Sequence, residues 1–221
     1  MAPYDWGWDV AIRWFPFVIS GIWTTLAITA GSMAGGLVLG VITAIIRVSG
    51  KRPFTTVATA YTEFFRNTPM FTQLIWVWYV IPRLTGFSPP PMVAVVSALS
   101  LNVGAFLAED MRAGILSIAR GQWEAAYAVG MTTMQAYWKI ILPQAILRIL
   151  PPLVSMWVTL FKETSIVSLV GIGEMFFRAR VGAMATYRTV EMYGMVSLIY
   201  LLLVLPQARF SDWVYQKVRV K

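Results

Sequence analysis

Long stretches without charged side chains alternate with short polar segments along this chain. Residues 14–46 carry no charged side chain, and further apolar stretches cover about 57–84, 84–108, 148–170 and 191–210. A helix needs about 20 mainly apolar residues to cross the hydrocarbon core of a membrane. We therefore predict an all-α, polytopic membrane protein with about five transmembrane helices and with its termini on opposite sides of the membrane.

Prolines and polar residues predict where these helices bend, begin and end. Pro69 should kink the second span, and Pro143 should end any helix that precedes the fourth, because proline lacks an N–H group and clashes with the preceding turn. The third helix should begin near Met92 and continue past Glu109 as it leaves the membrane. Residues 171–190 are polar and basic with three glycines, so we expect a loop or interfacial segment there.

Small residues recur at a spacing of four in the first span. Gly31 and Gly35 form one such pair, and Ser32, Gly36 and Gly40 lie in line. In lipid this spacing lets a second helix approach closely. Glycine is also common in membrane helices without such a role, and the sequence leaves both readings open.

The composition supports a membrane protein and indicates its orientation. The chain is 58% hydrophobic and 13% charged, with a net charge of +8, whereas soluble domains are about 25% charged. Ten of the 18 lysines and arginines fall on one side of the predicted spans: Arg47, Lys51, Arg52, Arg112, Arg120, Lys139, Arg209, Lys217, Arg219 and Lys221. The positive-inside rule makes that side cytoplasmic, with the N-terminus outside and tryptophan-rich residues 1–13 as an outer interfacial segment.

Missing residue types exclude several kinds of chemistry. The chain has no cysteine and no histidine, which excludes thiol chemistry, the usual zinc sites and histidine acid–base catalysis. It also lacks the Gly-x-x-x-x-Gly-Lys-Ser/Thr pattern of a P-loop. We therefore expect no catalytic site, metal or cofactor in this chain, and any ATP must be bound by a partner.

The segment between the third and fourth spans carries a spaced motif. This segment, residues 121–141, is short and amphipathic, and the motif consists of Glu124, Ala125, Ala126, Gly130, Ile140, Leu142 and Pro143. Its spacing resembles the EAA signature of bacterial ABC importer permeases, which is Glu-Ala-Ala, three residues, Gly, nine residues and Ile-x-Leu-Pro. A surface helix with small residues is the alternative explanation.

The resemblance extends over most of residues 15–175. The stretch Phe65–Pro69 followed by Gln73-Leu74 is similar to the second-span motif of the polar amino acid permeases, and Lys162-Glu163-Thr164-Ser165 is similar to a later one. Arg66–Pro69 together with Tyr79–Pro82 looks most like the glutamate/aspartate type. The family resemblance implies a single transmembrane permease domain over residues 1–221, with the fold of a type I ABC importer permease.

The resemblance also implies partners and roles. Such a permease pairs with a second permease, identical or paralogous, and with two cytosolic ATPases, and a soluble binding protein delivers an amino acid from outside. The loop 121–141 is expected to hold a coupling helix that docks in the ATPase, where Ala125 and Ala126 allow close backbone contact. Glu124 can pair with a partner there, Gly130 permits the turn out of the helix, and Pro143 acts as a stiff joint.

Polar residues within the spans are candidates for the substrate pathway. The resemblance implies that Lys162, Glu163, Thr164 and Ser165 line the substrate region, together with Arg66, Asn67, Thr68 and Pro69. Alternatively, Lys162 extends to the outer interface. Glu63 and Arg66, three residues apart, are expected to pair within one helix. A secondary transporter or channel that works alone is the competing function, although the chain shows no internal repeat of the kind common in such carriers.

Overall fold

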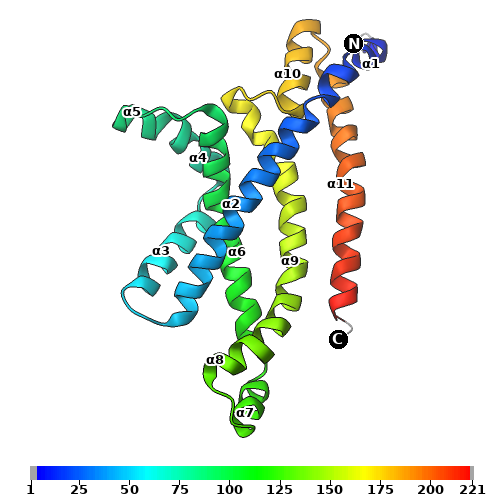
Figure 1. Cartoon of the computed structure of the whole chain (residues 1–221). Helices are drawn as coiled ribbons and strands as arrows, with labels where there is room; N and C mark the ends of the chain where they lie inside the picture. Colours follow the sequence, from blue (N-terminus) through cyan, green and yellow to red (C-terminus); the bar gives the residue numbers. More distant parts are fainter. Residues whose placement is uncertain (1–3, 220–221) are drawn as a thin grey trace.

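The computed structural model describes residues 4–219, and the regular elements in that range are helices (Figure 1). Within residues 4–219, four helical segments are long and apolar enough to cross a membrane: Ile22–Ser49, Pro91–Leu116, Thr133–Val170 and Thr189–Val218. They contain the four long helices α2 (Ile22–Ser49), α6 (Pro91–Leu116), α9 (Leu142–Glu163) and α11 (Thr189–Arg219). Each overlaps one of the predicted spans.

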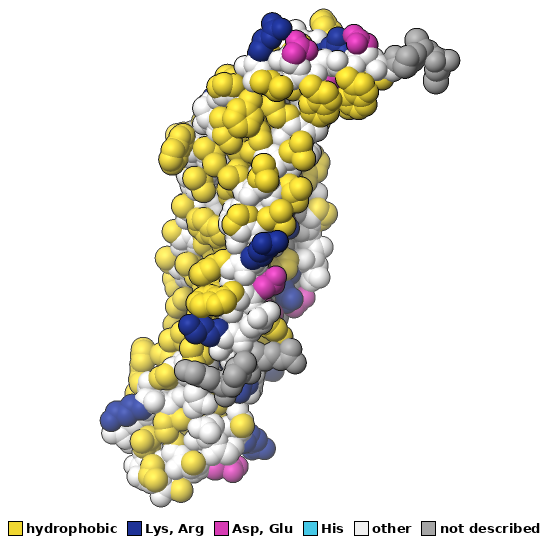
Figure 2. Space-filling view, turned by 90° about the vertical axis from the view of Figure 1, so that its right-hand side faces the viewer, with side chains coloured by type: hydrophobic (Ala, Val, Ile, Leu, Met, Phe, Trp, Pro, Cys, Tyr) yellow, Lys and Arg dark blue, Asp and Glu magenta, His cyan; other side chains and the backbone are white. Residues whose placement is uncertain are grey.

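The surface agrees with a membrane location. Figure 2 shows hydrophobic side chains covering most of one face, with charged side chains gathered at the upper end and scattered over the lower part. α1 lies at one end of the molecule, and α11 runs towards the other (Figure 1). Lys221, residues 1–3 and the side chain of Arg219, which entered the orientation and domain predictions, lie outside the described residues.

The glycine row of α2 packs against α6. A Cβ atom placed on Gly36 would lie 2.6 Å from Val103 Cγ1, and one on Gly40 would lie 2.9 Å from Leu107 Cβ. From the other side, a Cβ on Gly104 would lie 2.8 Å from Leu39 Cβ. These separations are too short for real carbon atoms, so the two backbones approach closely only because the side chains are absent. The helix-contact interpretation of the row is therefore the correct one.

The prediction of one kinked helix over 57–84 is wrong. The segment divides into α3 (Phe54–Asn67), α4 (Met70–Ile75), the π-helical turn η1 (Trp76–Val80) and α5 (Ile81–Thr85). The break lies at Thr68, which is extended (φ −114°, ψ 142°) because a residue before proline avoids the helical region. Buried Gln73 stabilises the break by donating to the carbonyls of Phe65 (2.9 Å) and Thr68 (3.0 Å).

The prediction that Pro143 ends a helix is also wrong. Helix α8 (Thr133–Ala136), the π-helical turn η2 (Tyr137–Ile141) and α9 follow one another without a break, with Pro143 in the first turn of α9. A wider π turn does not require the hydrogen bond that proline cannot donate. The same arrangement recurs where η1 precedes Pro82.

The segment 171–190, expected to be a loop or interfacial segment, contains the helix α10 (Met175–Thr186), which follows the 3₁₀ turn η3 (Thr164–Val170). Buried Glu174 caps α10 by accepting hydrogen bonds from the N–H groups of Phe176 (2.7 Å) and Phe177 (2.6 Å). Burial nevertheless raises the pKa of Glu174 to about 7. With α1 (Trp8–Ile19) and the start of α11, α10 encloses a second apolar core at this end (Figure 1).

Candidate functional site

The predicted coupling segment forms a short helix, α7 (Arg120–Ala128), at the end of the molecule opposite α1 and α10 (Figure 1). Gly130 follows α7 with a left-handed φ of 77° and has open space around the position of a Cβ. The N–H of Gly130 donates to Tyr127 O (3.0 Å), and that of Met131 donates to Ala126 O (3.1 Å). These two bonds form a Schellman motif, so glycine is needed for the backbone turn itself.

The exposed side of α7 differs from the one predicted. Glu124 and Ala125 are exposed, whereas Ala126 is fully buried within the chain itself. Burial of Ala126 contradicts the expectation that both alanines make room for a partner, and for Ala125 that role stays a prediction. Ala126 lies on the inner face of α7, where its small side chain allows the helix to pack against the rest of the loop.

The loop 121–141 contacts both neighbouring long helices. Ile141 and Ala145 are buried together with Ile115 of α6 and with Ile118, which follows that helix, and Ile140 packs against this cluster. Two polar bonds support it, because Gln144 Nε2 donates to Gln122 Oε1 (3.1 Å) and Arg148 Nη1 donates to Ser117 O (2.6 Å). Leu142 is half-buried and Pro143 is exposed. Trp123 of α7 packs against the same cluster, so a displacement of α7 would reach α6 and α9 together.

The candidate pathway residues of α9 and η3 lie in different environments. Lys162 is exposed, Glu163 and Ser165 are half-buried, and Thr164 is buried with its hydroxyl donating to Phe161 O (2.8 Å). Neighbouring residues on a helix point in different directions, which explains why Lys162 and Glu163 differ in exposure. Among the described residues, neither of these two side chains forms a salt bridge.

The other candidate pathway residues lie around the break between α3 and α4. The predicted pair of Glu63 with Arg66 is wrong, because Glu63 instead accepts a hydrogen bond from Asn67 Nδ2 (2.8 Å). Arg66 lies over the ring of Phe106 (5.6 Å) and 3.8 Å from Glu109. Thr68 Oγ1 accepts a hydrogen bond from Gln73 (2.8 Å), and Pro69 is exposed. Within residues 4–219 no hydrogen bond or salt bridge joins this group to residues 162–165.

A cluster around Glu109 was not predicted. Glu109 on α6 forms salt bridges with Arg47 at the end of α2 and with Arg112 one turn later, and Arg66 lies 3.8 Å away. We call these four residues the Glu109 cluster. The side chains of Arg47 and Glu109 are only 10% and 19% exposed. The spacing of three residues between Glu109 and Arg112 indicates that these two can pair. Arg47 lies 62 residues from Glu109 in the sequence, so no local pattern predicts that salt bridge.

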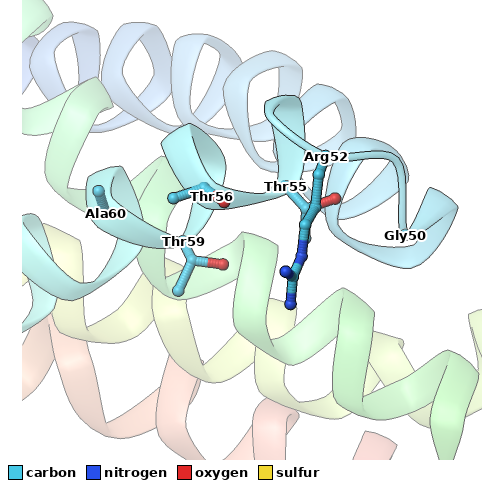
Figure 3. Close-up of a pocket in the computed structure, with 6 residues that line it drawn as sticks. All are labelled: Gly50, Arg52, Thr55, Thr56, Thr59 and Ala60. Carbon is cyan, nitrogen blue, oxygen red and sulfur yellow. The ribbon is translucent and has the colours of Figure 1, made fainter.

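A polar hollow of about 590 Å³ opens beside the turn between α2 and α3 (Figure 3). Its lining consists of Gly50, Arg52, Thr55, Thr56, Thr59 and Ala60. In the described part of the chain, no three His, Cys, Asp or Glu side chains lie together in an arrangement suited to a metal ion. The polar groups here are hydroxyls and a guanidinium, which suit a hydrated or zwitterionic ligand rather than a metal.

Comparisons with known proteins agree with this architecture. The family model described as "Binding-protein-dependent transport system inner membrane component" matches residues 36–220. The arginine transport system permease protein ArtQ of Bacillus subtilis is 40% identical over 197 residues, covering 89% of this chain and 90% of that protein. The glutamate/aspartate import permease protein GltK of Escherichia coli is 32% identical over 204 residues, covering 89% and 91%.

Solved structures show the same likeness. A crystal structure of an amino acid ABC transporter with histidines contains a chain that is 32% identical and superposes with a TM-score of 0.92, covering 97% of this chain and 100% of that chain. The inward-facing MetNI methionine ABC transporter has a TM-score of 0.73 at 23% identity, covering 91% of this chain and 95% of that chain, so it shows the shared fold.

The helical spans, together with these matches, define a multi-pass ABC transporter permease. The chain belongs to the binding-protein-dependent inner membrane transport components, and among them to the amino acid ABC transporter permeases. Membership makes it a transport component of the inner membrane and not an enzyme, and it implies an ATPase and a binding protein as partners.

Proposed function

We propose that this chain forms half of the translocation pathway of a polar amino acid importer and that α7 transmits the movement of a cytosolic ATPase to the pathway. The observation that carries the proposal is the construction of the coupling loop. It presents Glu124 and Ala125 to the outside, while Trp123 of α7 packs against the cluster of Ile115, Ile118, Ile141 and Ala145, and Gln122 accepts a hydrogen bond from Gln144 of α9. A partner that moves α7 therefore moves two membrane helices as one body.

The full assembly we propose has two ATPase subunits, a second permease subunit that is identical or paralogous, and a binding protein that delivers the amino acid. The N-terminus lies outside, and the end that carries α7 is cytoplasmic. The α2–α3 turn, which holds Lys51 and Arg52, lies at the same end as α7 (Figure 1), and this agrees with the positive-inside rule. Membrane lipid surrounds the apolar face, and no nucleic acid partner is involved.

The substrate we propose is a polar amino acid. The relatives are named for arginine, cystine, glutamine and glutamate or aspartate, which differ in side chain and share the zwitterionic backbone. Glutamate or aspartate is the candidate favoured by the motif Arg66–Pro69, whereas the relative named for arginine has the higher identity of the two reported above. We therefore assign recognition within this chain to the shared carboxylate and ammonium groups.

Within the pathway, we propose that Glu163 and Ser165 face the substrate, while Arg66, Asn67, Thr68 and Pro69 shape the region around the break. Support comes from the half-buried positions of Glu163 and Ser165, since an ionisable side chain inside a membrane normally faces a cavity or a partner. Thr164 stabilises the turn because its hydroxyl is already paired. Exposed Lys162 either contributes to the pathway or extends to the interface.

Reconstitution tests the proposed function directly. The chain is purified from its native host with its bound partners, which are identified together with any retained amino acid by mass spectrometry. In proteoliposomes the complex should accumulate the amino acid only with ATP and binding protein present. Uptake driven by an ion gradient, with the purified chain alone and without ATP, would instead establish a secondary transporter.

A further inference from the structure

Helix α3 presents three distinct faces. Ala58 and Thr62 are buried against the rest of the protein. Phe54, Val57 and Phe64 form an exposed apolar face, with exposures of 65%, 68% and 60%. A third face carries four polar residues at helical spacings of three and four: Thr56, Thr59, Glu63 and Asn67. Thr59 is half-buried and the other three are exposed. We call these four residues the α3 polar stripe.

The C-terminal half of the α3 polar stripe, which begins at Glu63, lies at the depth of the membrane centre. Tyr61 donates from its hydroxyl to Leu101 O (2.7 Å), and Asn102 Nδ2 donates to Phe65 O (3.1 Å). Leu101 and Asn102 are close to the midpoint of α6, one of the spanning helices. Glu63, which lies between Tyr61 and Phe65 in the sequence, is therefore about half-way across the bilayer.

A polar stripe at this depth is unfavourable against lipid. A charged side chain at the centre of a bilayer is costly, so it normally faces a cavity or a partner. Within the described chain, the partner of Glu63 is Asn67 of the same stripe, and this leaves the stripe as a whole open to the outside. The neighbouring apolar face of Phe54, Val57 and Phe64 has the character expected of a lipid contact.

We propose that the α3 polar stripe lines the water-filled route by which the amino acid passes from the membrane centre to the cytoplasm. This inference rests on the proposed import function and adds to it the lining of the exit. At its lower end the stripe joins the polar hollow of Figure 3, because Thr56 and Thr59 belong to both. Glu63 supplies a carboxylate for the ammonium group of the substrate, and the threonine hydroxyls supply neutral hydrogen-bonding groups.

The absence of cysteine from the sequence makes the stripe directly measurable. Each of Thr59→Cys and Glu63→Cys introduces a single thiol into this chain, and Val57→Cys and Phe64→Cys are matched controls on the apolar face of the same helix. The complete transporter is reconstituted without ATP and treated on the cytoplasmic side with a charged, membrane-impermeant thiol reagent. Labelling is read as the mass increase of this chain alone.

We expect both stripe positions to be labelled and both apolar positions to stay unlabelled, since a thiol in lipid is neither ionised nor reachable by a charged reagent. The transported amino acid should slow labelling at position 63, and Glu63→Gln should lower the rate of uptake. Equal labelling of the two faces overturns the inference, and so does a stripe that stays unlabelled because it is buried against the second permease. Either result is compatible with ATP-driven import by the complex. Loss of ATP-driven import by the unaltered complex would instead refute the proposed function.

Discussion

Replacing Glu109 by glutamine should destabilise the protein strongly, because it removes the only carboxylate that the structure shows bridging Arg47 and Arg112. The side chain of Arg47 is 10% exposed and has little access to water once its partner is lost. A pair of charges about 4 Å apart is worth about 4 kcal/mol at an effective dielectric constant of about 20. Breaking a largely buried pair costs about 3–5 kcal/mol, so the two magnitudes agree.

The assay is thermal unfolding of the purified protein in detergent. For a chain of this size the loss corresponds to a fall in Tm on the order of 10 °C. The matched control is Asp9→Asn, which breaks the salt bridge between Asp9 and Arg13. Both side chains of this pair are exposed, Arg13 by 77% and Asp9 by 65%. That change should cost less than about 1 kcal/mol. Similar shifts for the two variants would refute the reasoning that burial gives the Glu109 cluster its strength.

Three further predictions concern packing, pH and transport. Gly36→Ala should destabilise the protein by about 1–3 kcal/mol in the same assay, because the new Cβ would lie 2.6 Å from Val103 Cγ1. Gly31→Ala is the control and should have little effect, because its Cβ would lie 3.4 Å from the nearest atom of Val96. Equal effects of the two variants would contradict the packing argument. Burial raises the pKa of Glu174 from 4.5 to about 7, so the unfolded chain loses this proton first, and the free energy of unfolding should fall as pH rises through that window. Glu174→Gln should remove up to about 3 kcal/mol of this pH dependence, and parallel Tm–pH curves for the two proteins would show that Glu174 is not responsible. Glu163→Ala should change uptake or selectivity in proteoliposomes while leaving Tm nearly unchanged, and unaltered uptake would return Glu163 to a structural role.

Much of the fold was predictable because its signals are local and long. An uncharged run of residues identifies a spanning helix without knowledge of its neighbours. The glycine row of α2 left a helix contact and ordinary glycine tolerance both open, and only the structure shows a contact with α6 through Val103 and Leu107. The position of Gly130 after α7 also agrees with the sequence motif, since the left-handed turn depends on that one residue.

The errors have identifiable physical causes. Pro143 does not end a helix because the π-helical turn η2 widens the preceding turn of the backbone. The low helix propensity of proline does not predict such a turn. The break at Thr68 is stabilised by Gln73, which in turn accepts a hydrogen bond from Asn102 of α6 (3.0 Å). Contacts between residues so far apart in sequence leave no periodic pattern, and the salt bridge between Arg47 and Glu109 was missed for the same reason.

A pair of glycine variants tests most directly whether α7 couples an ATPase to the pathway. Gly130 follows α7 and Gly86 follows α5 at φ values of 77° and 71°, and each has open space where a Cβ would lie. Gly130→Asp and Gly86→Asp therefore introduce the same charge and a similar backbone strain, about 1–2 kcal/mol, in different parts of the fold.

The measurement is ATP-driven uptake together with ATP hydrolysis stimulated by the binding protein, in proteoliposomes that contain equal amounts of each assembled variant. Gly130→Asp should abolish uptake and the stimulation of hydrolysis, while Gly86→Asp should retain both. Normal uptake by Gly130→Asp, or equal losses in the two variants, would contradict the coupling role of α7.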